Sequence, residues 1–284
     1  MIDLKRNSKG EFVEATGLNS QTWRCYKPGQ KEDFSISRSR FEDFTRCPRC
    51  FYLNVVKGLK DIDTIPFTLN NTVDLLVKAE FDYCREKQIP HEVMKDENIN
   101  AVPFQHEEID NWRNARSKGV EYHHKNLNLI LSGGIDDVWT IKNSKPPELI
   151  IVDYKAQAKK EKELNTKNYL EDRFHQGYKF QLDFYRYLFH NLGFKIHKTG
   201  YFLVYNAKQE RKNFGKNMEF QRFLVPYKFK DETLDEIESI VTDMKKIMDG
   251  NTLPKGNRSC QECAFIRAGS ELILDDRKNL IRKE

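Results

Sequence analysis

The chain contains 284 residues with a formal net charge of +5, and its composition is 38% hydrophobic, 32% charged and 12% aromatic. This length suffices for one large domain or two small ones, and the aromatic content argues against disorder. The sequence has no run of 18 apolar residues, which excludes a membrane-spanning helix, and its first eleven residues lack the apolar core of a signal peptide. We therefore expect a cytoplasmic protein without membrane association. Its basic excess fits a polyanionic partner without requiring one.

The first part of the chain is predicted to be an arm followed by two helices. Residues 1–33 are polar and show no sustained period, which indicates an irregular arm or a short hairpin. A helix is predicted to begin after Ser37, a residue type that caps helix N-termini. A longer helix is predicted over residues 68–86, where apolar side chains recur at helical spacing. This apolar stripe comprises Val73, Leu76, Val77, Phe81 and Tyr83–Cys84.

The middle of the chain is predicted to form consecutive strands. The alternating run 126–130 and the following run 131–139 indicate two strands separated by a bend at Gly133 and Gly134. The apolar, β-branched run that begins at Ile150 predicts a third, buried strand. Short consecutive strands usually pair in antiparallel fashion, so the second and third strands are expected to be neighbours.

A charged pair stands at the end of the third strand. Asp153 and Lys155 are two residues apart, so they point to one side of the strand, whereas Tyr154 points to the other. Taken alone, this pair favours a strand end that emerges into solvent with a surface ion pair. Antiparallel pairing would place Asp136 beside Asp153, and Asp137 could exchange roles with Asp136. Two such carboxylates suit a hard divalent cation, and Lys155 could then polarise a water molecule or stabilise negative charge.

The C-terminal half is predicted to contain two helices and two strands. Residues 157–177 form a long polar loop rich in lysine, which could be a mobile flap or simply a solvated loop. The periodicity predicts a helix over residues 178–192, ended by Gly193, and a second helix over residues 231–248. Strands are predicted over residues 201–205 and 219–226, and a short helix, 107–116, precedes the middle strands.

Two Cys-x-x-Cys pairs, Cys47 with Cys50 and Cys260 with Cys263, lie near opposite ends of the chain. Each such pair can chelate a metal through two thiolates on one turn, so together they predict a clasp that joins the N-terminal and C-terminal parts. Four thiolates suit zinc or a four-iron cluster, 4Fe–4S. The alternative is that the cysteines are ordinary packing and loop residues.

Three segments together resemble a known family. They are Gly-Gly-Ile-Asp at 133–136, Val-Asp-Tyr-Lys at 152–155, and Gln181 followed by Tyr185. Their order and spacing resemble the PD-(D/E)xK nuclease superfamily, in particular its RecB-like branch, which includes exonucleases of CRISPR adaptation. The resemblance covers roughly residues 34–265. It implies an α/β fold of the restriction-endonuclease (RecB-like) type, a mixed β-sheet core flanked by helices.

The resemblance also implies the composition of an active site. Asp136 and Asp153 would bind Mg²⁺ or Mn²⁺, and Lys155 would act on the attacked phosphate. Gln181 and Tyr185 would position the substrate strand. In this branch a histidine near the start of the second long helix often completes the metal site, and Asp74 stands at the matching position. Glu80 is the fallback ligand on that helix.

The cysteines depart from the pattern of the branch. Its members often hold an iron–sulfur cluster with one N-terminal and three C-terminal cysteines, whereas this chain has two and two. The identity of the metal therefore stays open between iron–sulfur and zinc.

These observations predict a metal-dependent DNA nuclease, of exonuclease type, that acts on single-stranded DNA or on double-stranded ends. Residues expected to contact DNA phosphates are Arg38, Arg40, Lys159 and Lys160. The alternative function is a non-catalytic nucleic-acid-binding adaptor on the same scaffold. The predicted organisation is an arm at 1–33, a nuclease domain at 34–271 that includes the cysteine clasp, and a charged, frayed tail at 272–284.

Overall fold

The computed structural model describes residues 4–19, 21–62, 68–115, 118–160, 167, 169–209 and 217–281. The chain divides into two compact units. Unit 1 comprises Met1–Phe34, Ser39–Ile65 and Ser239–Glu284, and unit 2 comprises Ser35–Arg38 and Pro66–Glu238. In the described part of the chain, no helix has both the length and the apolar character needed to span a membrane.

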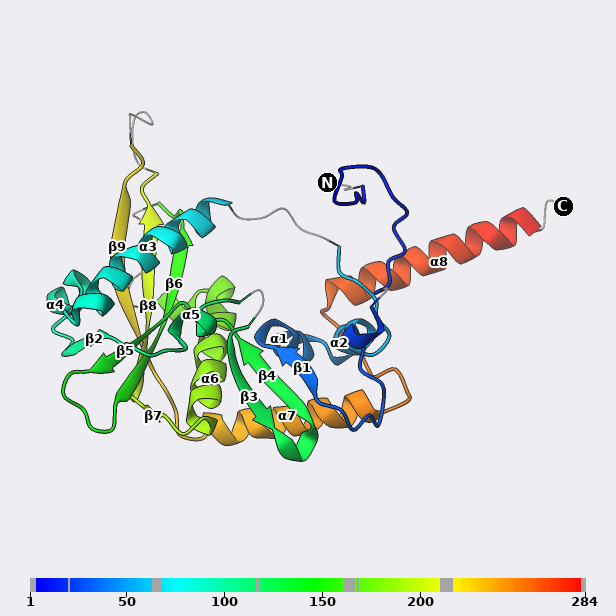
Figure 1. Ribbon diagram of the computed structural model, residues 1–284. Coiled ribbons are helices and arrows are strands. Elements are labelled where there is room, and N and C mark those ends of the chain that lie inside the picture. Colours follow the sequence, from blue (N-terminus) through cyan, green and yellow to red (C-terminus); the bar gives the residue numbers. More distant parts are fainter. Residues whose placement is uncertain are drawn as a thin grey trace. The chain divides into compact units, whose positions relative to one another are not determined.

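The larger unit, unit 2, is built on a six-stranded mixed sheet (Figure 1). Its strand order is β2-β5-β6-β8-β9, with the short β7 paired to β6. The pairing of β6 with β8 and with β7 is parallel, and the other pairs are antiparallel. The strands are β2 (Ala101–Pro103), β5 (Asp137–Ile141), β6 (Glu148–Gln157), β7 (Lys195–Ile196), β8 (Thr199–Ala207) and β9 (Phe220–Lys228). The mixed sheet with flanking helices confirms the predicted fold class.

Two helices pack on the two faces of β6. Helix α3 (Thr68–Lys87) contributes Val77 and Phe81 to a buried cluster with Val152 and Tyr154 of β6. Helix α6 (Gln176–Asn191) lies on the other face, which carries the odd-numbered residues of β6. Because side chains alternate along a strand, one strand supplies the apolar core through its even positions and the polar site through its odd ones.

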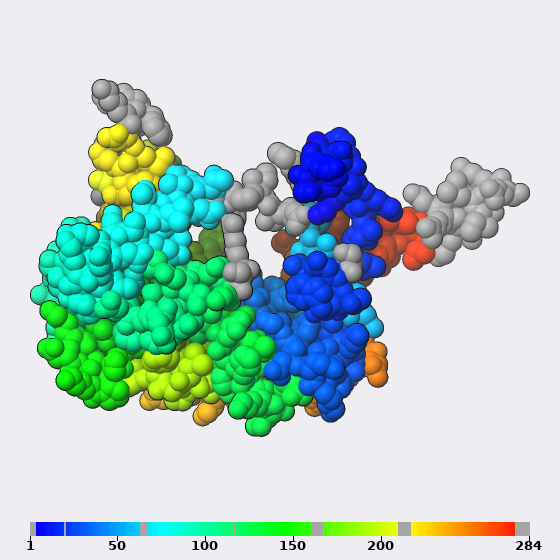
Figure 2. Space-filling view, viewed as in Figure 1, coloured from blue at the N-terminus to red at the C-terminus, as the bar shows by residue number. Residues whose placement is uncertain are grey.

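The outer side of α3 departs from the predicted apolar stripe. Leu76 and Tyr83 were expected to be inward-facing, but both are exposed. The surface of this helix, in cyan in Figure 2, forms part of the face of unit 2. The buried stripe is therefore narrower than the sequence pattern predicted, and it follows Val73, Val77, Phe81 and Cys84.

A second, three-stranded sheet in unit 2 has the order β1-β4-β3. Its strands are β1 (Phe34–Ser37), β3 (Val120–His124) and β4 (Leu129–Gly133). The run 126–130, expected to be a strand, instead begins with the 3-10 turn η2 (Lys125–Leu127), and Asn128 has a left-handed φ of 50°. His124 is buried, and its Nε2 lies 2.8 Å from Glu238 Oε1.

The remaining elements of unit 2 are short connections. They are α4 (Glu92–Asp96), α5 (Ile109–Trp112), η4 (Tyr169–Glu171) and η5 (Arg173–His175). Helix α7 (Thr233–Asp249) begins in unit 2 and continues into unit 1.

Unit 1 is mainly helical. It contains η1 (Thr22–Arg24), α1 (Arg38–Arg46), α2 (Pro48–Val55) and α8 (Gln261–Ile281), and α1 begins one residue after the predicted cap, Ser37. Tyr26 and Tyr52 are buried, and their hydroxyls donate to Asp249 Oδ1 (2.5 Å) and to the Gly250 carbonyl (2.9 Å). Helix α8 runs through residues 272–281, where a frayed tail was predicted.

Candidate active site and cysteine cluster

The end of β6 places Asp153 and Lys155 on the α6 face of the sheet, whereas Tyr154 points to the α3 face and packs 5.7 Å from the Phe81 ring. Asp153 is only 1% exposed and forms an ion pair with the Lys155 ammonium. The predicted alternation of side chains along this strand is therefore confirmed. Because Asp153 is buried, its ion pair with Lys155 is not the surface pair that was the alternative.

Asp136 reaches the same place from a bend between two sheets. Residues 134–136 link β4 of the small sheet to β5 of the large one. Asp137 pairs with Val152 across the ladder, so Asp136 lies beside Asp153. The Tyr154 N–H donates to Asp136 Oδ2 at 2.7 Å, which fixes the carboxylate. Burial, followed by the neighbouring negative charge of Asp153, raises the pKa of Asp136 to about 8.

The adjacent acid, Asp137, has a different partner and a different task. It is fully buried, and its carboxylate is held by the Arg85 guanidinium and by the Tyr154 hydroxyl, which donates to Oδ2 at 2.7 Å. Such a buried ion pair leaves no ligand atom available for a cation. Asp137 is therefore a core residue. Of the two neighbouring acids, Asp136 is the one that lies beside Asp153.

The carboxylates leave acceptor capacity that the protein does not fill. Apart from the Lys155 ammonium, which forms an ion pair with Oδ2, no described group donates a hydrogen bond to Asp153, although the residue is buried. A second negative charge beside Asp153 is costly at this buried place, which is why the pKa of Asp136 is raised, and a bound divalent cation would offset that cost. Oxygen donors of this kind fit a hard divalent cation such as Mg²⁺ or Mn²⁺.

Helix α3 contributes a third acid nearby. Asp74 pairs with Lys78 at 2.8 Å, and the charges of both act on Asp136. Asp74, Asp136 and Asp153 do not bring their ligand atoms within 4.8 Å of one another in the described structure. Glu80, the fallback ligand, instead faces His91 at 3.3 Å.

A chain of hydrogen bonds orients Lys155. Its ammonium donates to Gln181 Oε1 at 3.0 Å, Gln181 Nε2 donates to the Tyr185 hydroxyl at 3.3 Å, and that hydroxyl donates to the Gly134 carbonyl at 2.5 Å. A Cβ at Gly133 would come within 2.8 Å of the Tyr185 ring, so only glycine fits there. These hydrogen bonds thus connect the Gly-Gly-Ile-Asp, Val-Asp-Tyr-Lys and Gln181–Tyr185 motifs in one place.

Electrostatics determine the protonation of Lys155. Burial acts to lower the pKa of the ammonium, but the charges of Asp153 and Asp136 outweigh burial and raise the pKa above its usual value. Lys155 therefore carries its proton at neutral pH, which suits it to stabilise negative charge and to orient a water molecule.

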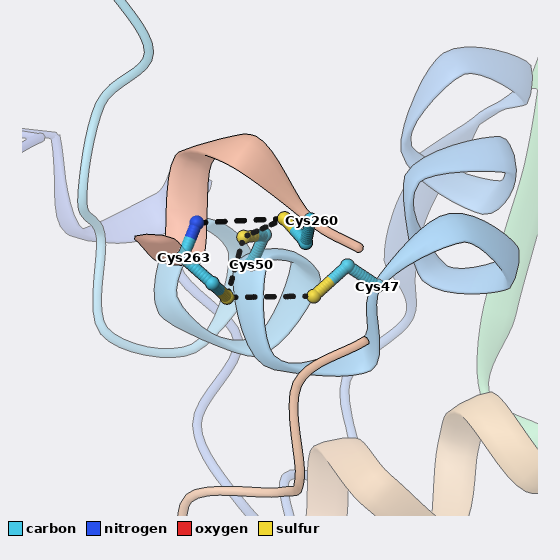
Figure 3. Close-up of side chains that lie close together, drawn as sticks. All are labelled: Cys47, Cys50, Cys260 and Cys263. Atoms are coloured by element: carbon cyan, nitrogen blue, oxygen red, sulfur yellow. Dashed lines mark hydrogen bonds between the residues drawn. The ribbon is translucent and has the colours of Figure 1, made fainter. Parts of the chain in front are cut away.

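A second cluster lies in unit 1, where all four predicted cysteines converge (Figure 3). Their sulfur atoms lie within 4.8 Å of one another. The Sγ–Sγ distances are 3.6 Å for Cys47 and Cys263, 3.5 Å for Cys50 and Cys260, and 3.4 Å for Cys50 and Cys263. These distances exclude disulfides, whose sulfurs are about 2.05 Å apart. Among the described residues this is the group of His, Cys, Asp and Glu ligands that meets the geometry for a metal ion.

Comparison with known proteins identifies the family. The family model described as the PD-(D/E)XK nuclease superfamily matches residues 68–268. The chain belongs to this superfamily. The matched range contains the whole carboxylate constellation and the second cysteine pair, but Cys47 and Cys50 lie outside it.

Other comparisons add less. No curated protein matches the chain at the level of significance required. A crystal structure described as a "Putative exonuclease" from Eubacterium rectale is similar, with a TM-score of 0.40, 15% identity, and coverage of 83% of this chain and 88% of that one. A likeness of this size does not decide fold or function.

Three aromatic side chains beside Lys155, those of Tyr178, His175 and Tyr169, were not predicted from the sequence. Lys155 Nζ lies 4.3 Å from the centre of the Tyr178 ring, and Tyr178 stacks on His175 at 4.8 Å. His175 in turn packs 4.2 Å from Tyr169, whose carbonyl lies 2.7 Å from His175 Nδ1. The sequence did contain a usable sign, because Tyr178 precedes Gln181 by three residues and therefore shares its helix face.

The predicted DNA contacts lie in different surroundings. Arg38 belongs to unit 2, where its charge acts on Tyr185, whereas Arg40 belongs to unit 1. Lys159 pairs with Asp172, and Lys160 is exposed. Of the predicted lysine-rich loop, 157–177, residues 161–166 and 168, including Lys162, lie outside the described residues, whereas η4, η5 and the start of α6 occupy most of its C-terminal part.

Proposed function

We propose that this chain is a metal-dependent DNA nuclease that hydrolyses phosphodiester bonds, with an exonuclease-like preference for ends. The supporting observation is the convergence of Asp136, Asp153 and Lys155 in unit 2, where the buried Asp153 carboxylate has the Lys155 ammonium as its described partner. Membership of the superfamily makes a nucleic acid the expected substrate.

The acids would hold Mg²⁺ or Mn²⁺. We assign Asp136 and Asp153 as ligands, with Asp74 as a further ligand from α3 and the Tyr154 carbonyl as a possible backbone donor. When bound, such a cation supplies Lewis acidity toward the phosphate and a more acidic water molecule.

The remaining residues have roles that follow from their contacts. Lys155 keeps its proton and directs the ammonium toward a developing negative charge on the phosphate. Gln181 bridges Lys155 and Tyr185, so it fixes the ammonium and offers an amide edge toward the substrate strand. Tyr185 ties this arrangement to the backbone through the Gly134 carbonyl. Arg38, Lys159 and Lys160 of unit 2, with Arg40 of unit 1, are proposed to contact phosphates.

The four cysteines are proposed to hold a metal of their own, either zinc or a 4Fe–4S cluster. All four side chains converge, so the alternative of scattered packing thiols loses its basis.

A nuclease assay tests this proposal. Linear and covalently closed circular DNA, single- and double-stranded, are incubated with the wild-type protein and Mg²⁺ or Mn²⁺, in parallel with Asp153→Asn and Lys155→Ala. The matched control is Lys195→Ala, which removes a lysine paired with Glu148 at the other end of β6. We expect cleavage of linear DNA by the wild type and the control, and none by the two site variants. A wild-type protein that binds DNA but cuts none of these substrates would establish the adaptor instead.

A further inference from the structure

We infer that the cysteine site of unit 1 holds a single zinc ion, and not the iron–sulfur cluster that resemblance to the RecB-like branch implies. This inference is independent of the proposed nuclease activity, because it concerns Cys47, Cys50, Cys260 and Cys263 and no residue of unit 2.

The spacing of the sulfur atoms carries the argument. Four thiolates around one zinc ion, each with a Zn–S bond of about 2.3 Å in tetrahedral geometry, lie about 3.8 Å from one another. The observed Sγ–Sγ distances of 3.4, 3.5 and 3.6 Å are close to this value, and every pair lies within 4.8 Å.

A four-iron cluster requires a different spacing. Its four thiolates bind four separate iron atoms at the corners of a cube that also contains sulfide, so they are spread over a much larger tetrahedron. Four sulfur atoms that all lie within 4.8 Å of one another surround a space for one ion. The residues present therefore fit zinc and do not fit the cluster.

The local backbone supports four thiolates at this spacing. Cys47 is the N-cap of α2, and Cys260 directly precedes α8, so each pair sits at the positive end of a helix (Figure 3). Backbone N–H groups donate to the sulfurs, from Asn257 to Cys47 Sγ at 3.4 Å and from Cys263 to Cys260 Sγ at 3.5 Å. Such donors stabilise the negative charge that four thiolates leave around a divalent ion.

The ligand set indicates a structural ion. All four positions of the tetrahedron are filled by protein thiolates, which leaves none open for water or substrate. The ion would join two segments 210 residues apart in the sequence, between Cys50 and Cys260. A link over so long a loop removes much conformational freedom from the unfolded chain. The zinc would therefore hold α2 and the start of α8 together within unit 1.

Metal analysis of the purified full chain tests the inference. The protein is produced in medium that contains both iron and zinc and is purified without oxygen, so that a labile cluster would survive. We expect one zinc per chain, with iron and acid-labile sulfide below a tenth of that amount. About four irons and four sulfides per chain would overturn the inference, as would a folded protein that contains neither metal.

Cobalt substitution and one matched pair of variants refine the test. Replacement of the metal by Co²⁺ is expected to give the intense visible bands of tetrahedral thiolate coordination. Cys260→Ser is expected to lose at least 90% of the bound zinc, whereas Cys84→Ser, which removes a buried cysteine of α3 in unit 2, keeps it. If Cys260→Ser fails to fold, the wild-type metal content and the cobalt spectrum still decide. Octahedral cobalt bands in the wild type would exclude the site.

Discussion

The two candidate metal sites of this chain differ in how much of their coordination the protein supplies by itself. In unit 1, four sulfur atoms converge within 4.8 Å, and backbone N–H groups already donate to them. In unit 2, Asp136 and Asp153 come together beside Lys155, and no described group other than that lysine donates to the Asp153 carboxylate. An ion held by the four thiolates would have no open position, whereas a cation held by the two carboxylates would keep positions for water and substrate.

This difference suggests that one site contributes to folding and the other to catalysis. A closed site of thiolates contributes its binding free energy to folding. A site of two neighbouring carboxylates brings like charges together, and a bound cation would offset their repulsion. We therefore expect changes at the cysteines to alter the stability of unit 1, and changes at the carboxylates to alter turnover.

The largest expected effect is on stability at the cysteine site. The double variant Cys260→Ser/Cys263→Ser removes half of the ligands and is expected to lower the free energy of unfolding by more than about 5 kcal/mol, because structural zinc binding is coupled to folding. Hydrogen exchange followed by mass spectrometry should show the loss in α2 and α8 while β6 stays protected. Equal loss of protection in β6 would contradict a site that serves unit 1.

The reciprocal change acts on the carboxylate site. Asp153→Asn is expected to reduce cleavage roughly thousandfold or more, because it removes a charge that the cation requires. Binding of uncut DNA, measured by fluorescence anisotropy, should change by less than threefold, and zinc content should stay at one per chain. The control Asp110→Asn alters an exposed acid of α5 and should keep full activity. Retained cleavage by Asp153→Asn would remove this residue from the mechanism.

A buried acid on α6 predicts a pH effect. Burial raises the pKa of Asp183 to about 6, although the Tyr227 hydroxyl donates to it at 2.8 Å and lowers the pKa. In the folded state Asp183 keeps its proton up to about pH 6, whereas in the unfolded state, with a pKa near 3.8, it loses the proton at lower pH. The free energy of unfolding therefore falls as the pH rises from about 4 to about 6. Asp183→Asn should remove this slope and stabilise the protein by about 2 kcal/mol at pH 7 relative to its effect at pH 4. The measurement is urea unfolding at both pH values, and an unchanged slope would contradict it.

The aromatic contact to Lys155 predicts a smaller effect. Tyr178→Ala removes a ring 4.3 Å from the ammonium and should lower kcat about fivefold, as expected for a cation–π contact worth roughly 1 kcal/mol. Tyr178→Phe keeps the ring and should restore kcat, and KM should not move in either variant. A loss of the same size in Tyr178→Phe would assign the effect to the hydroxyl.

The smallest expected effect concerns a single phosphate contact. Lys160→Ala should reduce the slope of log Kd against log salt by about 0.9 if this exposed lysine contacts DNA. Lys195→Ala changes a residue of β7 that pairs with the first residue of β6, and it should leave the slope unchanged. Equal slopes for the wild type and Lys160→Ala would show that Lys160 contributes no phosphate contact.

Much of the site could be predicted from the sequence because it depends on local alternation and on three short motifs. The positions of Asp153, Lys155 and Tyr154 follow from the period of a strand. The convergence of the two cysteine pairs was predicted from their spacing, and the structure confirms it.

Other features depended on long-range partners that no local pattern contains. The choice between Asp136 and Asp137 is made by Arg85, 52 residues before Asp137. His124 is buried because Glu238, 114 residues away, faces its ring. Strand β1 has only four residues before a helix, so its pairing with β4 outweighs the weak local pattern. Residues 272–274, Leu-Ile-Leu, are all exposed in α8, so no amphipathic packing pattern marked the later part of this helix in the sequence.

The pair Asp136–Asp137 has one more consequence, for how the sheet is assembled. If β5 slipped by one residue against β6, every side chain of β5 would change face, and Arg85 would lose Asp137 from its buried position. The guanidinium would then keep only Asp82, which is partly exposed and also pairs with Arg113, and would lose its fully buried counter-charge. The buried pairing of Asp137 thus favours one register of β5 against β6, and that register is the one that places Asp136 beside Asp153.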